Sequence, residues 1–316
     1  MIDYFTKIYS SIKNRNSFLT KIRFYSLQRV LVRQTANLIL PVFFHFTKEK
    51  YRLSEVKNKV DDGLIVSFTS FPARIKKVHL VVESILRQSV LPDRIILWLS
   101  KEQFPSEESL PKKLLEQKGR GLEIVICEGD LRSYKKFYYT VRDYPKSDFI
   151  IIDDDIFYPS DTIETLINCN NEYPDNVCFN RGRKLNVHDK NITKYKSWYS
   201  LEKGTEPRYD IMATGVGGVY YPANILNQHV LNEKVFMNTC KFADDIWLYV
   251  MTLMNDNKLV KTNNNKTFLP VINKNNITLT SVNVGEDLND VQINNVREYF
   301  IKYHGLDPFK QLYRIN

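Results

Sequence analysis

Short apolar runs separated by helical patterns dominate the chain from residue 64 onward. Leu64–Thr69, Arg94–Leu99, Leu122–Cys127 and Phe149–Ile152 are rich in β-branched and aromatic residues, as strands buried on both faces are. Between the first two runs, Val78–Gln88 carries apolar residues at helical spacing. Strand, helix and strand in this order predict a right-handed βαβ unit. The pattern therefore predicts an α/β domain with a mainly parallel central sheet flanked by helices.

The second half of the chain continues this alternation less regularly. A helix is expected over Ser160–Asn171, where Asp161 and Glu164 have the spacing of a capping box, and a short strand over Val177–Asn180. Arg181–Glu206 is long, polar and aromatic, which indicates a functional loop rather than a part of the core.

Three regions are expected from these patterns. Residues 1–62 form a basic, amphipathic helical extension, 63–265 the main α/β domain, and 266–316 a strand and a helix that close the domain. Within the extension, the apolar run Leu38–Phe44 is shorter than the ~20 residues that span a bilayer. Two interpretations of the extension are equally supported by the sequence. It lies in the plane of a membrane, or it packs, either on the domain or on a second copy of the chain.

The charge of the chain restricts its partners. A net charge of +9 favours anionic ones: nucleic acid, an acidic membrane surface or a phosphate-bearing substrate. Nucleic acid is not expected, because the chain has no Lys/Arg run and no zinc-binding pattern. The four cysteines form no CxxC pair, and Met1–Thr20 holds no continuous apolar signal core, so a cytoplasmic protein with reduced thiols is expected.

An acidic triplet interrupts the apolar pattern at the end of the fourth strand. Asp153, Asp154 and Asp155 lie between Ile152 and Ile156, where three like charges repel one another. A divalent cation that prefers oxygen ligands, Mn²⁺ or Mg²⁺, would relieve this repulsion. If the alternation of the strand continues, Asp153 and Asp155 face one way as ligands and Asp154 the other. The alternative is an acidic turn that only ends the strand.

Two later stretches also carry candidate chemistry. Ala213–Pro222 contains three of the eleven glycines of the chain within four residues, which lets the backbone approach a ligand closely or makes a tight bend. Phe242–Tyr249 begins a helix with Asp244 and Asp245, which supply a general base or simply cap the helix.

Together these motifs resemble nucleotide-sugar glycosyltransferases with the GT-A fold, of the family-two-like type found in bacterial capsule and surface polysaccharide synthesis. The resemblance makes the triplet an Asp-x-Asp motif that holds the metal against the donor diphosphate. It also makes Asp245 the catalytic base, with Asp244 as the fallback. The chain departs from many relatives at Leu97–Ser100, where they carry an acidic pair for the uracil.

The remaining site residues are expected on the same basis. The donor is expected to contact residues of the first strand's exit loop, of the loop and helix before the triplet, and the middle carboxylate of the triplet: Thr69, Ser70, Phe71, Arg74, Arg132, Lys135, Lys136 and Asp154. The acceptor sugar is expected to contact the glycine-rich stretch and nearby aromatic side chains: Gly217, Gly218, Tyr220, Trp198 and Trp247.

The resemblance implies a metal-dependent, inverting transfer of a sugar from a nucleoside diphosphate sugar, with a UDP-sugar favoured, to a glycan or lipid-linked glycan. It also implies a peripheral location on the inner face of the cell membrane. Two alternatives remain at this point: a sugar-phosphate or phosphoryl transferase, and a catalytically silent glycan-binding subunit of the same fold.

Overall fold

The computed structural model describes residues 1–12, 18, 20, 23–48, 53, 63–188, 191–273 and 287–313. The domain boundary expected at residue 62 and the basic residues Lys13, Arg15 and Lys21 lie outside these ranges.

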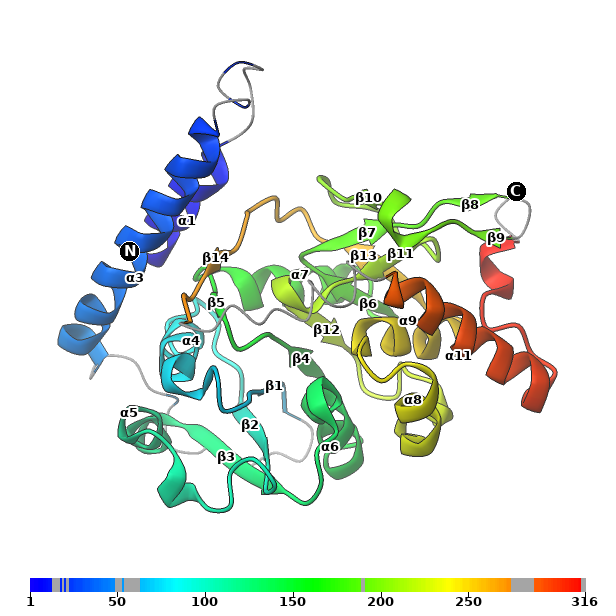
Figure 1. Cartoon of the computed structure of the whole chain (residues 1–316), viewed down its shortest axis with the longest axis horizontal. Helices are drawn as coiled ribbons and strands as arrows, with labels where there is room; N and C mark the ends of the chain where they lie inside the picture. Colours follow the sequence, from blue (N-terminus) through cyan, green and yellow to red (C-terminus); the bar gives the residue numbers. More distant parts are fainter. Residues whose placement is uncertain are drawn as a thin grey trace.

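A mixed seven-stranded sheet forms the centre of the molecule (Figure 1). Its order is β13-β6-β12-β4-β1-β2-β3, and β12 alone runs antiparallel to its neighbours in this sheet. The strands are β1 (Ile65–Thr69), β2 (Arg94–Ser100), β3 (Leu122–Cys127), β4 (Phe149–Ile151), β6 (Asn176–Phe179), β12 (Val219–Tyr221) and β13 (Lys258–Lys261). The mainly parallel α/β sheet expected from the apolar runs is therefore confirmed.

The strands are apolar throughout because both faces of the sheet are covered. Along β2, Ile95 and Leu97 enter one buried cluster, and Ile96 and Trp98 enter the cluster on the opposite face. Successive side chains of a strand point to opposite faces, so a strand covered on both sides shows a continuous apolar run.

Different helices cover the two faces. The helices α4 (Val78–Ile85) and α7 (Thr162–Glu172) contribute to one buried cluster. Four others contribute to the second: α6 (Lys135–Asp143), α8 (Glu233–Thr239), α9 (Asp244–Met254) and α11 (Leu288–His304). The short helix α5 (Lys112–Leu115) precedes β3.

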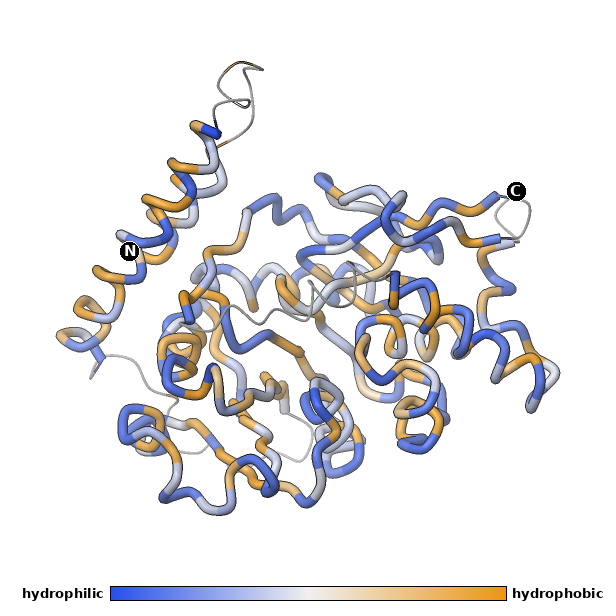
Figure 2. The backbone as a smooth tube through the Cα atoms, in the orientation of Figure 1, coloured by the Kyte–Doolittle hydropathy of each residue, from blue (hydrophilic) through white to orange (hydrophobic). Residues whose placement is uncertain are grey.

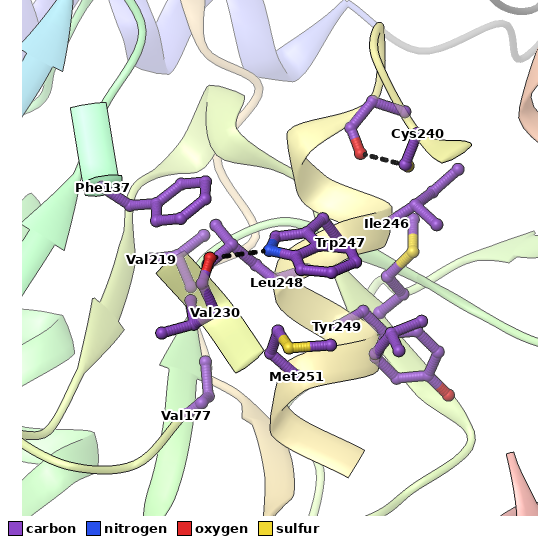
Figure 3. Close-up of a cluster of buried hydrophobic side chains, with 14 of the residues drawn as sticks. Phe137, Val177, Val219, Val230, Cys240, Ile246, Trp247, Leu248, Tyr249 and Met251 are labelled. Atoms are coloured by element: carbon purple, nitrogen blue, oxygen red, sulfur yellow. Dashed lines mark hydrogen bonds between the residues drawn. The ribbon is translucent and has the colours of Figure 1, made fainter. Parts of the chain in front are cut away.

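The second cluster is densely packed around Trp247 of α9 (Figure 3). This side chain is fully buried, with its ring centroid 5.8 Å from that of Phe236 and 6.2 Å from that of Phe300, and its indole N–H donates to the carbonyl of Val230 at 3.0 Å.

The expected capping box of α7 is absent. Asp161 occupies the N-cap position without a cap hydrogen bond. Its carboxylate instead forms an ion pair with Lys266, and the carboxylate of Glu164 accepts a hydrogen bond from Ser89 at 2.6 Å. Ion pairing thus replaces capping at this helix terminus.

The stretch Arg181–Glu206, expected to be a functional loop rather than a part of the core, is partly folded into strands and partly buried, while its functional role stays a prediction. The stretch contains four short strands, which together with β11 after it form a three-stranded sheet, order β10-β7-β11, and a separate hairpin. These strands are β7 (Gly182–Lys184), β8 (Val187–His188), β9 (Asn191–Ile192), β10 (Tyr199–Ser200) and β11 (Ile211–Ala213). Leu185, Tyr195 and Trp198 anchor the stretch because their side chains are buried in the second cluster.

Two N-terminal helices, α1 (Ile2–Ser11) and α3 (Phe24–Thr47), lie side by side at one edge of the molecule (Figure 1). The apolar run 38–44 lies within α3, whose Ala36, Leu40 and Phe44 are buried in the same cluster as α4 and α7. Packing on the domain, one of the two expected roles of this extension, is therefore observed. No helix among the described residues is long and apolar enough to cross a membrane.

A two-stranded sheet connects these helices with the centre of the domain. It pairs β5 (Ile156–Phe157), which follows the acidic triplet, with β14 (Leu269–Pro270). The side-chain amide of Asn37 in α3 donates to the Pro270 carbonyl at 2.9 Å and accepts from the Ile272 N–H at 2.8 Å.

Candidate active site

The acidic triplet forms a turn between β4 and β5. Strand β4 ends at Ile151, and the backbone N–H of Asp153 donates to the hydroxyl of the buried Tyr158 at 2.8 Å. This bond holds the turn against the core. Strand alternation therefore stops before the triplet, so the argument that placed Asp153 and Asp155 on one side and Asp154 on the other does not apply.

Asp154 is the inward member of the triplet. Its buried carboxylate accepts hydrogen bonds from Ser70 at 2.5 Å and from Arg74 at 2.7 Å. The Arg74 guanidinium also lies 3.0 Å from the Asp155 carboxylate. Two expected donor-binding residues thus organise the triplet itself. The side chains of Asp153 and Asp155 are 27% and 26% exposed, and are the two available to a ligand.

The triplet carries more negative charge than its surroundings neutralise. Burial and the neighbouring Asp153 raise the pKa of Asp155 to about 7, although Arg74 opposes this shift. Burial also raises the pKa of Asp154, again against the effect of Arg74. An additional cation would therefore favour the ionised form of these carboxyl groups.

Lys136 connects the triplet with the second acidic pair. This side chain comes from the first turn of α6 and is buried, with its Nζ 3.2 Å from Asp153 Oδ1 and 2.9 Å from Asp244 Oδ2. Although burial opposes its charge, Asp244 and Asp153 raise the pKa of Lys136 well above the ordinary lysine value. Two motifs about ninety residues apart in sequence thus meet around one buried cation.

The acidic pair opens α9, as expected. Asp244 is buried and ion-paired with Lys136, while Asp245 accepts the backbone N–H of Gly215 at 3.2 and 3.3 Å. Ala243 occupies the N-cap position and both aspartates lie in the first turn of α9, where their contacts with Lys136 and Gly215 go beyond helix capping. Burial and the neighbouring Asp244 raise the pKa of Asp245, although Lys136 opposes the shift.

Gly215 lies at the junction of the two acidic motifs. A Cβ atom at this position would lie 3.0 Å from Asp153 Oδ1, 3.0 Å from Lys136 Nζ and 3.5 Å from Asp245 Oδ1. The absence of a side chain therefore lets these groups approach one another. The sequence pattern drew attention to this glycine-rich stretch but not to this glycine.

The glycines that were expected at the acceptor site have other neighbours. A Cβ atom at Gly217 would lie 2.9 Å from the Arg181 backbone, and one at Gly218 3.3 Å from Leu166. Gly218 has a φ of +85°, which glycine adopts readily. These two glycines form the bend before β12, which was the alternative interpretation of the glycine-rich stretch.

The three aromatic side chains expected to stack on an acceptor sugar are buried, which corrects that expectation. Trp247 is fully enclosed, and the Trp198 indole N–H donates to the Thr193 carbonyl at 2.9 Å. The Tyr220 hydroxyl donates to Asp148, which precedes β4 at the end opposite the triplet. The aromatic content of these segments reflects core packing, which leaves no ring face free for a sugar.

The other residues expected to contact the donor differ in whether they lie near the acidic motifs. Phe71 stacks with Arg74, whose guanidinium carbon is 5.3 Å from the ring centroid, and Thr69 donates to the Trp98 carbonyl of β2 at 2.7 Å. The Arg132 guanidinium carbon lies 5.0 Å from the centroid of Phe242, next to the acidic pair. Lys135, by contrast, is buried against Asp130 and does not contact either acidic motif.

The residues of the triplet fit a hard divalent cation. Asp153 and Asp155 are partly exposed carboxylates, and Mg²⁺ is commonly held by one or two carboxylates together with substrate phosphates and water. Within the described ranges, no group of three His, Cys, Asp or Glu side chains is arranged to hold a metal. Asp153 and Asp155 are therefore the residues of the triplet that could hold Mn²⁺ or Mg²⁺.

No protein-family model matches the chain. No curated protein matches it either. Among solved structures, the chain is similar to the UTP-bound UGPase from Acinetobacter baumannii, at 12% identity over 80% of this chain and 98% of that one, with a TM-score of 0.41. It is also similar to the mannosyltransferase PcManGT from Pyrobaculum calidifontis in complex with GDP-Man and Mn²⁺, at 11% identity over 48% of this chain and 45% of that one, with a TM-score of 0.31. Similarity this distant carries no argument about activity, which has to come from the side chains of this chain.

Proposed function

We propose that this protein is a metal-dependent glycosyltransferase that moves a sugar from a nucleoside diphosphate sugar to a hydroxyl group of a glycan or lipid-linked glycan. The observation that carries the proposal is the contact of Lys136 with both Asp153 and Asp244. It joins a carboxylate cluster suited to a metal–diphosphate with a second carboxylate pair suited to proton transfer. Sugar transfer from such a donor needs both functions at one centre.

The leaving-group side of the reaction is supported by the triplet. A divalent ion held by Asp153 and Asp155 would stabilise the negative charge that grows on the departing diphosphate. Arg74 keeps Asp154 and Asp155 in place, and Lys136 pairs with Asp153, so the triplet has fixed positive charge on both sides. A UDP-sugar is the proposed donor, with the loop Thr69–Phe71 as the proposed site of nucleoside contact.

The acceptor side is supported by the different surroundings of the two carboxylates of the pair. Asp244 is buried and is held by its ion pair with Lys136. Asp245 has a raised pKa, because of burial and the neighbouring Asp244, and accepts a hydrogen bond from the backbone N–H of Gly215. Asp245 therefore takes the proton of the acceptor hydroxyl as its oxygen bonds to the anomeric carbon and the bond from this carbon to the diphosphate breaks. Attack from the side opposite the diphosphate inverts the anomeric centre.

A role in bacterial surface polysaccharide synthesis completes the proposal. The acceptor is then lipid-linked, and the enzyme acts at the inner face of the cell membrane, which agrees with the excess of positive charge on the chain.

Calorimetric titration with UDP, in the presence and absence of Mn²⁺, tests this proposal. The wild-type protein should bind UDP more tightly with the metal than without it. Asp155→Ala should reduce this metal-dependent gain in affinity at least tenfold. Asp143→Ala, which removes an exposed carboxylate paired with Arg142, serves as the matched control and should bind as the wild type does. Equal metal-dependent affinity in Asp155→Ala and the wild type would remove the triplet from the site.

A further inference from the structure

An exposed apolar stripe runs along α3. It consists of Leu27, Leu31, Leu38, Val42 and Phe46, which follow one another at spacings of four or seven residues and therefore share one face of the helix. Their side chains are between 55% and 79% exposed. Figure 2 shows the alternation of apolar and polar segments along this helix. We call these five residues the outer stripe.

The opposite face of α3 is fixed to the domain. Ala36, Leu40 and Phe44 are buried there, and Phe44 packs against Phe157 with ring centroids 6.2 Å apart. The two hydrogen bonds of Asn37 to the β14 segment hold the helix in this orientation. The outer stripe therefore points away from the described part of the domain, and packing on the domain does not account for it.

The segment that carries the stripe has a large excess of positive charge. Residues 1–48 contain eight basic residues and one acidic residue, Asp3. The carboxylate of Asp3 is already engaged, since it accepts hydrogen bonds from the Ser160 backbone N–H at 2.8 Å and the Ser160 hydroxyl at 2.9 Å. The basic residues are Lys7, Lys13, Arg15, Lys21, Arg23, Arg29, Arg33 and Lys48.

We propose that the outer stripe of α3 is the docking face for an anionic lipid bilayer, with α3 lying in the plane of the interface. The proposal rests on the membrane-surface location proposed above and names the residues that produce it. An exposed apolar stripe on a basic segment is the combination that binds an anionic interface, through apolar burial and charge attraction together. The stripe covers nineteen residue steps, or ~29 Å of helix, so it presents a line of contact rather than a single anchor.

Charge separates this occupant from a second copy of the chain. Pairing two outer stripes would bring two segments of the same strong positive charge together, and the stripe itself offers no carboxylate to offset them. An anionic bilayer supplies the opposite charge.

Vesicle flotation of the full chain tests the proposal. The probes are phosphatidylcholine vesicles and vesicles in which about a third of the lipid is phosphatidylglycerol. The test variant combines Leu31→Gln, Leu38→Gln and Phe46→Gln, since glutamine keeps helix propensity while removing apolar surface. The control combines Val291→Gln, Ile301→Gln and Tyr303→Gln, which are comparably exposed apolar positions on α11. Circular dichroism and UDP titration of each preparation verify the fold and the donor site separately from vesicle binding.

The wild type and the control should float with the anionic vesicles, bind neutral vesicles at least tenfold more weakly, and lose binding as salt rises. The test variant should lose at least tenfold in anionic-vesicle binding with its UDP titration unchanged. Three results would overturn the proposal. One is equal binding by the test variant and the wild type. The second is equal binding of the wild type to neutral and anionic vesicles, a result that does not depend on whether any variant folds. The third is a wild-type dimer, measured by light scattering, that the test variant converts to a monomer.

Discussion

The environment of each carboxylate assigns it a separate task. Lys136 is buried between Asp153 and Asp244, so its charge is available to both acidic motifs and screened little by water. The carboxylate of Asp154 accepts hydrogen bonds from Ser70 and Arg74, so its role in the triplet is structural. Asp245 has a raised pKa and accepts a hydrogen bond from the Gly215 N–H, while Asp244 of the same pair is ion-paired with Lys136. These differences lead to two predictions.

Replacing the proposed base should separate chemistry from binding. An amide at position 245 keeps the size of the carboxylate but cannot accept a proton, so Asp245→Asn should lower single-turnover sugar transfer by ~10²–10⁴-fold. Donor affinity should stay within about twofold of the wild type, because the proposed donor site is the triplet. The measurement is rapid-quench transfer beside calorimetric donor binding.

Asp244→Asn provides the comparison within the pair. It removes the ion pair between Lys136 and Asp244. Because Lys136 then interacts differently with Asp153, donor binding should weaken as well as transfer. If Asp245→Asn transfers sugar at nearly the wild-type rate while Asp244→Asn does not, the assignment of the base is reversed.

The raised pKa of Asp155 predicts a pH-dependent penalty in the metal-free protein. The carboxyl group titrates near 7 in the folded state against an ordinary value of 3.8, so the folded state holds its proton more tightly than the unfolded state. Its contribution to stability is therefore lost as pH rises from about 4 to about 7. Asp155→Asn stays neutral, so without metal it should be more stable than the wild type by about 1–2 kcal/mol at pH 8, a magnitude reduced for solvent screening, and by much less at pH 5.

Urea unfolding with a chelator present, at pH 5 and pH 8, measures this difference. The exposed Asp143→Asn should stay within about 0.5 kcal/mol of the wild type at both pH values. A lower stability of Asp155→Asn at pH 8 would show that the attraction of Arg74 outweighs burial and the repulsion from Asp153 at this carboxylate.

At the scale of single residues, the sequence predicted the acidic groups but not all that surrounds them. Three carboxylates between apolar residues are a local pattern, and so is an acidic pair at a helix start. The contacts of Lys136, Gly215 and Tyr158 depend on how distant segments meet, which no local pattern contains. The role of an aromatic residue is equally hard to predict from the sequence. A tryptophan such as Trp247 or Trp198 has the same sequence pattern whether it lines a site or fills a core.

At the scale of elements, β14 couples the N-terminal helices to the active-site turn. Asn37 binds this strand from α3, and the Val271 N–H beside it donates to the Asp155 carbonyl at 2.7 Å. The N-terminal helices are thus attached to the same backbone that positions the triplet.

Asn37→Ala should therefore lower the free energy of unfolding by about 1–3 kcal/mol, because it leaves a carbonyl and an N–H of the β14 segment without their partner. Gln34→Ala, at an exposed position on the same helix, should change it by no more than about 0.5 kcal/mol. Thermal unfolding of the three proteins gives the comparison. Identical unfolding of Asn37→Ala and the wild type would show that α3 is held by its apolar face alone.

The elements that the sequence predicted well are those with strong internal patterns. The strands β1 to β4 are continuous apolar runs because helices cover both faces of the sheet. The strands β7 to β11 have two or three residues each, and their pairing is set by the burial of Leu185, Tyr195 and Trp198 rather than by local alternation. Such short strands read as loop in a sequence.

At the scale of the whole molecule, the proposed chemistry and the proposed membrane face lie on connected parts of one structure. The outer stripe of α3 is oriented by Asn37 and Phe44, while the triplet lies beyond β14 and β5. An enzyme held at an anionic surface through α3 would have its active-site turn attached to the membrane-bound helix through β14 and β5.

The central claim is that the two acidic motifs form one centre for sugar transfer, and product identity tests it most directly. The full chain is incubated with Mn²⁺, a set of UDP- and GDP-sugars and a membrane lipid extract as the source of acceptor, and the nucleotide products are identified by mass spectrometry. One donor should yield the nucleoside diphosphate together with a glycosylated product, and Asp245→Asn should bind the same donor while releasing ~10²–10⁴-fold less of both. Release of a nucleoside monophosphate or triphosphate, or unchanged turnover in Asp245→Asn, would contradict the account.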